Sequence, residues 1–243
     1  MEETGIIANR KSHSRTSKRK VTILSIDGGG IRGIIPAVIL SYIEECLQRK
    51  TGNSKVVLSD YFDMMAGTST GGILTCFYLL PEGLPAKDAV GFYAQYGKSI
   101  FKKHSFNPLG LREEKYTQKG LEAALKQTMG DVKLSEVKKR CLITAYDMEQ
   151  RKAVMFTDKD AAVAGDIRNY YLRDVARATS AAPTYFQPAE VRSLGDAVSH
   201  LIDGGIFANN PTLCAWIEAH KSDFGFCKNP TADDLFILSV GTG

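Results

Sequence analysis

Three short strand-like runs in this chain each end in a cluster of glycines, and this pattern limits the fold more than any other feature. The runs are followed by Asp-Gly-Gly-Gly, Asp-Gly-Gly and Gly-Thr-Gly, and they occupy residues 21–26, 199–202 and 235–240. A short apolar run that is rich in β-branched residues and ends in glycine is typical of a buried β-strand closed by a tight turn. The sequence therefore predicts buried strands, each followed by glycines that leave the backbone at the strand end accessible.

Helical patterns alternate with these strands. Apolar residues recur with the period of a helix between Gly33 and Thr51, and other helices are predicted at residues 73–80, 119–129 and 172–181. Two further strand-like runs, joined by a turn, occupy residues 141–146 and 153–157. This alternation predicts an α/β fold in which a mainly parallel sheet has helices on both faces. The polar stretch 100–119 is predicted to be a loop or a flexible flap.

Most of the excess positive charge lies at the start of the chain. The net charge of +4 becomes −2 without six basic residues, which are Arg10, Lys11, Arg15, Lys18, Arg19 and Lys20. We expect residues 1–20 to be a disordered basic leader and residues 21–243 to form one domain. Residues 10–20 could also make peripheral contact with anionic lipid head groups. Nucleic acid is not an expected partner, because the leader has no interleaved aromatic residues.

The spacing of the cysteines and the lengths of the apolar runs indicate the cellular compartment in which we expect the protein. The five cysteines are scattered and form no Cys-x-x-Cys pair, which argues against a disulfide framework and a structural zinc site. The sequence has no secretory signal and no apolar run long enough to span a membrane. We therefore expect a cytoplasmic protein that is recruited to the membrane surface if its substrate is a membrane lipid. Because the chain ends directly on a strand and its glycines, we also expect the domain to be truncated at its C-terminus.

The segment Gly67-Thr-Ser-Thr-Gly71 has the spacing of a nucleophile elbow. A serine on a sharp turn between a strand and a helix needs small neighbours, because its backbone is strained and the substrate must approach closely. The flanking residues fit this arrangement, since an extended run precedes the segment and an apolar helix follows it. Ser69 is therefore the candidate nucleophile, and Gly67 and Gly71 are the glycines of the elbow.

The glycine turn after the first strand allows two functional interpretations. Residues 28–33 contain Gly-x-Gly-x-x-Gly between a strand and a helix, which is the pattern of a dinucleotide site. Such a site needs an acidic residue at the end of the next strand, whereas that strand leads into the Ser69 elbow. In the other interpretation, the N–H groups of Gly28, Gly29 and Gly30 form an oxyanion hole, with Arg32 adding positive charge.

The base that activates Ser69 is either a histidine or a carboxylate. A Ser-His-Asp esterase needs a histidine after the acid in chain order, and His220 is the one histidine in that position. His220 lies in a predicted helix, where a histidine on the surface is the more common outcome. Asp203 ends a predicted strand on a glycine turn, from which its carboxylate can reach Ser69. A Ser-Asp dyad therefore needs fewer assumptions, and the His220 esterase remains the alternative.

Four blocks, taken together and in order, resemble the patatin-like phospholipases, which are lipid acyl hydrolases. The blocks are Asp27-Gly-Gly-Gly-Ile-Arg-Gly33, Gly67-Thr-Ser-Thr-Gly-Gly72, residues 176–186 and Asp203-Gly-Gly-Ile-Phe-Ala-Asn-Asn-Pro211, and the closing residues 238–243 are also similar. The resemblance implies a three-layer α/β/α sandwich in which block 176–186 helps to position the site.

The same resemblance implies phospholipase A chemistry on membrane phospholipids. Ser69 would be the nucleophile that carries the acyl group, Asp203 the base, and the turn at 28–30 with Arg32 the oxyanion hole. The sequence has no calcium-loop pattern and no zinc-ligand spacing, so neither a metal nor another cofactor is expected. No motif specifies a regulatory ligand.

Overall fold

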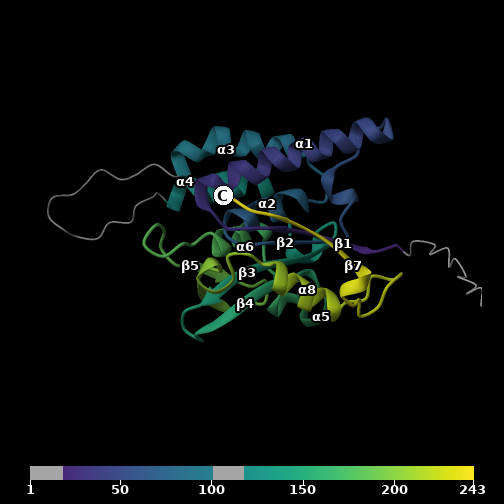
Figure 1. Cartoon of the computed structure of the whole chain (residues 1–243). Helices are drawn as coiled ribbons and strands as arrows, with labels where there is room; N and C mark the ends of the chain where they lie inside the picture. The colour runs from purple at the N-terminus through teal and green to yellow at the C-terminus, as the bar shows by residue number, and fades with distance from the viewer. Residues whose placement is uncertain (1–18, 101–117) are drawn as a thin grey trace, which may run out of the picture.

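In residues 19–100 and 118–243, which the computed structural model describes, seven strands form one sheet (Figure 1). The strands are β1 (Val21–Ile26), β2 (Met64–Gly67), β3 (Arg140–Asp147), β4 (Lys152–Thr157), β5 (Ala189–Arg192), β6 (Val198–Asp203) and β7 (Leu235–Val240). Strands β7, β1, β2 and β3 lie side by side and run parallel. Strands β4 and β6 run antiparallel to β3, and β5 runs antiparallel to β6. The predicted α/β fold is confirmed, with a sheet that is parallel at its centre and mixed as a whole.

The register along β3 brings the ends of two other strands together. Tyr146 pairs with both β4 and β6, so these two strands lie on opposite edges of β3. Leu142 pairs with both β4 and β2, so β2 and β6 share the remaining edge. Gly67 at the end of β2 lies opposite Ile143, and Asp203 at the end of β6 lies opposite Ala145. The two strands therefore meet head-on along β3.

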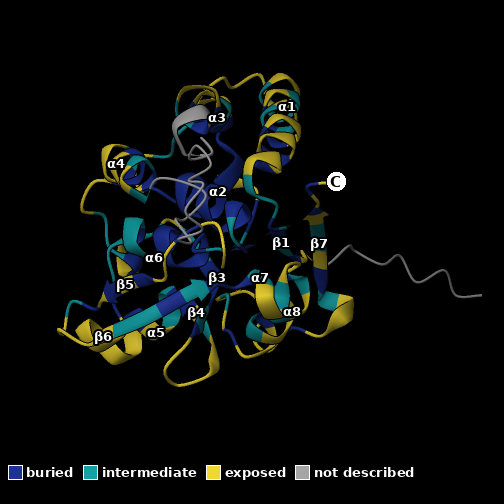
Figure 2. Ribbon diagram, turned by 90° about the vertical axis from the view of Figure 1, so that its left-hand side faces the viewer, coloured by how far each residue is buried: buried dark blue, intermediate teal, exposed yellow. Residues whose placement is uncertain are grey.

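Helices cover both faces of the sheet, as Figures 1 and 2 show. The described helices are α1 (Ile34–Thr51), α2 (Thr70–Tyr78), α3 (Ala86–Ile100), α4 (Gln118–Met129), α5 (Asp158–Ala164), α6 (Leu172–Thr179), α7 (Gly205–Ala208) and α8 (Thr212–His220). Leu24 and Ile26 of β1 belong to a large core with α1, α2, α3, α4 and α6. Val21 and Ile23 point to the other face, where α8 packs in a smaller core. Burial on both faces explains why β1 is a continuous apolar run.

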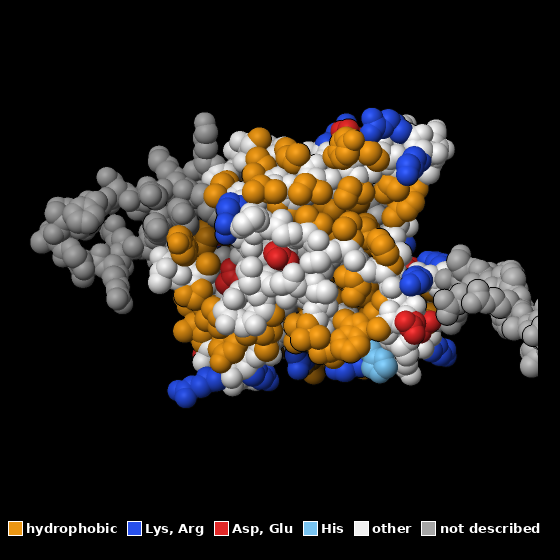
Figure 3. Space-filling view, in the orientation of Figure 1, with side chains coloured by type: hydrophobic (Ala, Val, Ile, Leu, Met, Phe, Trp, Pro, Cys, Tyr) orange, Lys and Arg blue, Asp and Glu red, His pale blue; other side chains and the backbone are white. Residues whose placement is uncertain are grey.

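The apolar residues that predict α1 are mostly exposed. The buried positions of this helix include Ala37 and Leu40, whereas the face that carries the apolar period lies in solvent, with exposed side chains of Ile34, Ile35, Val38, Ile39 and Tyr42. Figure 3 shows hydrophobic side chains, in orange, gathered over α1. The start of the helix is as predicted, and it ends at Thr51 because Gly52 adopts a left-handed conformation (φ 66°).

Several elements differ from the sequence-based prediction. The bounds of β1 and β7 are those predicted, but α3, α5 and β5 were not predicted. Helix α3 contains Gly91 and Gly97, which lower helix propensity. Strand β5 has only four residues, too few for a clear alternation. The predictions for the leader 1–20 and the loop 100–119 fall largely outside the described residues. No helix in the described ranges is both long and apolar enough to cross a bilayer.

Candidate active site

Ser69 lies on the turn between β2 and α2. Its backbone has φ 56° and ψ −124°. Residues other than glycine rarely adopt this conformation, which costs on the order of 1–3 kcal/mol. A Cβ at Gly67 would lie 2.2 Å from the carbonyl oxygen of Gly71, and a Cβ at Gly71 would lie 2.2 Å from that of Ile26. Both flanking glycines are therefore required by close backbone contacts. The start of α2 directs its positive dipole end toward the serine.

The hydroxyl of Ser69 donates a hydrogen bond to Oδ2 of Asp203 at 2.5 Å, although 134 residues separate them. Such a distance is typical of a hydrogen bond between a hydroxyl and a carboxylate. The other oxygen, Oδ1, accepts the N–H of Gly205 at 2.7 Å. Asp203 is only 5% exposed, and this burial raises the pKa of its carboxyl to about 6, while the bonds from Ser69 and Gly205 oppose the rise. A buried carboxylate with this pKa is ionised at neutral pH and can accept a proton.

The end of α6 and the segment after it hold both residues in place. The Oγ1 of Thr179 accepts the N–H of Ser69 at 2.8 Å. The carbonyl oxygen of Ala181 accepts the N–H of Asp203 at 3.0 Å. Block 176–186 thus contacts the backbone of the candidate nucleophile and of the candidate base.

The glycine turn lies against the elbow. A Cβ at Gly28 would lie 3.1 Å from Cβ of Ser69. The N–H of Gly28 is bonded to the carbonyl oxygen of Asn209 at 3.0 Å, and its carbonyl accepts the hydroxyl of Thr242 at 2.7 Å. Within the described residues we find no hydrogen bond from the N–H of Gly29 or Gly30. The turn therefore offers two N–H groups to a ligand, and the N–H of Gly28 has a structural partner.

Arg32 belongs to the short 3-10 helix Gly30–Gly33 that follows the turn. Its Nη1 donates to the carbonyl oxygen of Gly243 at 2.6 Å. The positive charge is therefore next to the turn, but part of the guanidinium binds the segment after β7. No acidic residue ends β2, where a dinucleotide site would need one to bind a ribose.

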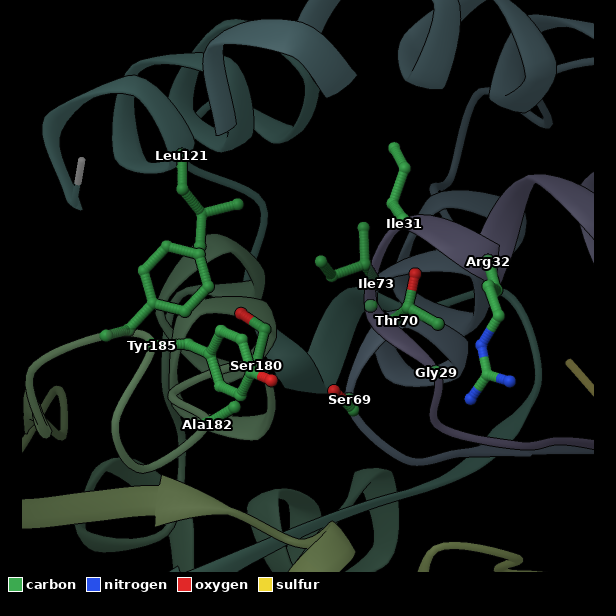
Figure 4. A pocket seen from close by; sticks show the side chains of 12 residues that line it. Gly29, Ile31, Arg32, Ser69, Thr70, Ile73, Leu121, Ser180, Ala182 and Tyr185 are labelled. Carbon is green, nitrogen blue, oxygen red and sulfur yellow. The ribbon is translucent and has the colours of Figure 1, made fainter. Parts of the chain in front are cut away.

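An apolar cavity of about 420 Å³ opens above Ser69. Figure 4 shows Leu121 and Tyr185 on one side, Ile31 and Ile73 on the other, and Ser69 at the base. The remaining lining comes from Gly29, Gly30, Arg32, Thr70, Ser180, Ala182 and Phe186. This volume is in the range of sites for small organic ligands, and the lining suits a hydrocarbon chain.

Tyr93 of α3 joins the elbow to the glycine turn. Its hydroxyl is buried and forms a hydrogen bond with the hydroxyl of Thr70, the first residue of α2. A Cβ at Gly33 would lie 2.0 Å from Oγ1 of Thr70 and 2.5 Å from the hydroxyl of Tyr93. Burial raises the pKa of Tyr93, so this hydroxyl remains protonated.

No described histidine forms a hydrogen bond with Ser69 or Asp203. Helix α8 begins near the end of β1, where Thr212 donates to the hydroxyl of Ser25, and it ends at His220. Nδ1 of His220 lies 3.1 Å from the carbonyl oxygen of Pro230, a residue that precedes the start of β7. His220 therefore lies near the amino ends of the parallel strands, whereas the elbow lies at their carboxyl ends. His200 instead lies 2.8 Å from Glu149, and His13 and His104 are outside the described residues.

Five residues of the site have a role that we did not predict from the sequence, and three of them are Thr179, Asn209 and Thr242. All three lie in the blocks that carry the family resemblance, which was the available signal, but their hydrogen bonds depend on the tertiary structure. Tyr93 and Leu121 lie outside those blocks, and no sequence pattern indicated their part in the site. No group of three or more histidines, cysteines or acidic residues in the described ranges is arranged to hold a metal ion.

Comparisons with known proteins find patatins and patatin-like proteins. A family model described as patatin-like phospholipase matches residues 24–216. The protein named "Probable inactive patatin-3-Kuras 1" from Solanum tuberosum is 35% identical over 98% of this chain and 66% of its own length. "Patatin-05" from the same species is 34% identical over 98% of this chain and 64% of its own length. "Patatin-like protein 2" from Oryza sativa subsp. indica is 33% identical over 96% of this chain and 63% of its own length.

The chain thus spans slightly less than two thirds of the length of these relatives. The crystal structure of VipD from Legionella pneumophila aligns with 92% of this chain and 50% of its own, at a TM-score of 0.43 and 12% identity. That likeness is too distant to support an argument about this chain.

Proposed function

Because this chain belongs to the patatin-like phospholipase family, we propose that it is a lipid acyl hydrolase of the phospholipase A type. The observation that carries the proposal is the hydrogen bond of 2.5 Å from Ser69 to the buried carboxylate of Asp203, at the base of an apolar cavity. One relative is named as probably inactive, so family membership alone does not imply turnover. The proposal therefore rests on the Ser69–Asp203 pair of this chain.

The proposed reaction has two steps that use the same pair. In the first, Asp203 takes the hydroxyl proton while Oγ of Ser69 forms a bond to the ester carbonyl carbon. The carbon–oxygen bond to the leaving group then breaks, and the lysolipid alkoxide takes the proton from Asp203. In the second step, water gives a proton to Asp203 and attacks the acyl-enzyme. Collapse of the intermediate releases the fatty acid and returns the proton to Ser69.

The developing negative charge on the carbonyl oxygen needs donors that are already in place. The N–H groups of Gly29 and Gly30 are the donors we propose, since both residues line the cavity with Ser69. Gly28 fixes the turn through its bonds to Asn209 and Thr242. Arg32 adds positive charge nearby and ties the turn to Gly243.

The apolar lining favours an acyl chain as the part of the substrate that enters the cavity. The side chains of Leu121, Ile73 and Phe186 form apolar walls. Transfer of a hydrocarbon chain from water to such walls is favourable. We propose membrane phospholipid as the substrate, with residues 10–20 as a peripheral contact to the bilayer. The proposed chemistry uses Ser69 and Asp203 and calls for no cofactor.

The test compares Ser69→Ala with wild type on phospholipid vesicles and on a triacylglycerol emulsion. Released fatty acid and lysolipid are measured by mass spectrometry. We expect turnover to fall to background in Ser69→Ala, a loss of about 10⁴-fold or more. Ser222→Ala is the matched control, because Ser222 is also buried but bonds to Glu218 in a remote helix. Absence of any Ser69-dependent release from both substrates would refute the proposal.

His220→Ala distinguishes the dyad from the alternative Ser-His-Asp esterase. Because His220 lies at the other end of the strands from Ser69, we expect full activity in this variant. A loss comparable to that of Ser69→Ala would favour the histidine mechanism instead.

A further inference from the structure

The peptide between Gly28 and Gly29 is held by a residue from the other end of the chain. Thr242 follows β7, and its buried hydroxyl donates to the carbonyl oxygen of Gly28 at 2.7 Å across 214 residues of sequence. The contact exists because Val240 is the register partner of Ile26, so the residues after β7 and β1 leave the sheet together. Nδ2 of Asn209 makes a longer contact with the same carbonyl at 3.4 Å.

Peptide geometry links this hydrogen bond to the candidate oxyanion hole. The described chain contains no cis peptide bond, and in a trans peptide the C=O and the N–H point in opposite directions. The carbonyl of Gly28 points at Thr242, so the N–H of Gly29 points away from it. Gly29 lines the cavity together with Ser69, and the orientation proposed below has its N–H on the cavity side.

We propose that Thr242 is a positioning residue of the oxyanion hole: its hydroxyl binds the Gly28 carbonyl and thereby aims the N–H of Gly29 at the reacting carbonyl oxygen. This inference rests on the proposed function, because it assigns a task to one donor of that mechanism. Thr242 does not touch the substrate. It acts through the orientation of a single peptide plane.

A turn of three glycines needs such a restraint. Glycine reaches conformations on both sides of the φ map, so the plane between Gly28 and Gly29 can rotate with little steric resistance. If this peptide plane were reversed, the carbonyl oxygen of Gly28 would face the cavity and place partial negative charge where the oxyanion forms. The hydrogen bond from Thr242 favours the one orientation that presents an N–H.

The side chain of Thr242 also packs directly on Gly29. A Cβ at Gly29 would lie 2.3 Å from Oγ1 and 2.8 Å from Cγ2 of Thr242. Hydroxyl and methyl therefore both contact the turn, and substitutions can separate them. Valine keeps the shape and removes the donor, whereas serine keeps the donor and removes the methyl group.

The experiment measures kcat and KM of Thr242→Val and Thr242→Ser on a soluble p-nitrophenyl ester. A misplaced donor lowers stabilisation of the transition state and leaves binding of the acyl chain intact, so we expect kcat of Thr242→Val to fall about 10- to 100-fold. We expect KM to change by less than about threefold, since the cavity walls are unchanged. Thr242→Ser should recover kcat to within about threefold of wild type, because it restores the donor.

Thr157→Val is the matched control. Thr157 is also buried, and its Oγ1 accepts a hydrogen bond from the N–H of Asp160 at the start of α5, outside the cavity lining. This variant loses a buried hydroxyl and some stability, and we expect its kcat to stay at the wild-type value. A drop in Thr157→Val equal to that in Thr242→Val would mean that lost stability, and not orientation, lowers the rate.

Two kinetic results would overturn the proposal. One is a kcat in Thr242→Val within twofold of wild type. The other is an equal fall in the serine and valine variants, which would assign the effect to the methyl group. The carbonyl ¹³C shift of Gly28 tests the hydrogen bond without reference to activity: we expect it to move in Thr242→Val and to return in Thr242→Ser. If wild type hydrolyses no ester, the proposed function fails, and an unchanged ¹³C shift would then refute the role of Thr242 separately.

Discussion

Replacement of Asp203 by asparagine should make the folded protein more stable while it abolishes the proposed reaction. Asparagine has the same shape, and its Oδ1 can still accept the N–H of Gly205, which is 2.7 Å from the aspartate oxygen. Its amide can still form a hydrogen bond with Ser69. What the substitution removes is a negative charge in a position that is only 5% exposed.

The magnitude follows from the pKa of Asp203. Burial raises this pKa from 3.8 to about 6, and a difference of that size corresponds to about 3 kcal/mol. The folded state holds the proton more tightly than the unfolded state does, so ionisation destabilises the fold. This cost is absent below about pH 3.8, where both states are protonated, and it is complete above about pH 6. About half of it is present at pH 5.

Urea unfolding at pH 4 and pH 7.5 measures the effect as a difference between the two proteins. We expect the free energy of unfolding of Asp203→Asn to exceed that of wild type by about 0.5 kcal/mol at pH 4 and by about 3 kcal/mol at pH 7.5. Asp233→Asn is the control, because Asp233 is exposed, and it should stay within about 0.5 kcal/mol of wild type at both pH values. The reasoning fails if Asp203→Asn is no more stable at pH 7.5, or if its advantage is as large at pH 4.

Three further predictions concern the pH dependence of the rate and the packing at two glycines. The kcat/KM of wild type should rise with pH and level off above an apparent pKa near 6, because Asp203 must be ionised to accept the Ser69 proton; a midpoint near 4 would contradict the assigned base. Gly67→Ala should lower the free energy of unfolding by about 3 kcal/mol or more, because its Cβ would lie 2.2 Å from a backbone oxygen. Gly91→Ala has open space in α3 and should raise it by about 0.5–1 kcal/mol. Thermal melts that rank these two variants in the opposite order would refute the packing argument.

The arrangement of the glycine turn and the elbow could be predicted from the sequence because it depends on local rules. Parallel strands have their carboxyl ends at one edge of a sheet, so the segments after Ile26, Gly67 and Val240 had to meet there. The apolar runs that end at these residues were visible without a structure. By contrast, the exposed face of α1 was not predictable. Its apolar period is that of a buried helix, but the core uses Ala37 and Leu40 on the other side.

The position of Asp203 shows why the proposed Ser69–Asp203 pair could not be derived from strand patterns alone. Strand β6 is antiparallel to its neighbours, so the rule that gathers carboxyl ends at one edge would place its last residue away from Ser69. The residue reaches the site because β6 occupies the part of β3 that β2 leaves free, which puts Asp203 opposite Ala145 and Gly67 opposite Ile143. The length of β3 therefore sets the distance between Asp203 and Ser69, the candidate base and nucleophile. Eight residues allow two strands to meet on one edge, whereas a strand as short as β2 would leave no partner for β6. This dependence is a property of tertiary pairing, and in the sequence only the positions of the histidines, the glycine turn after Asp203 and the motif resemblance indicated Asp203.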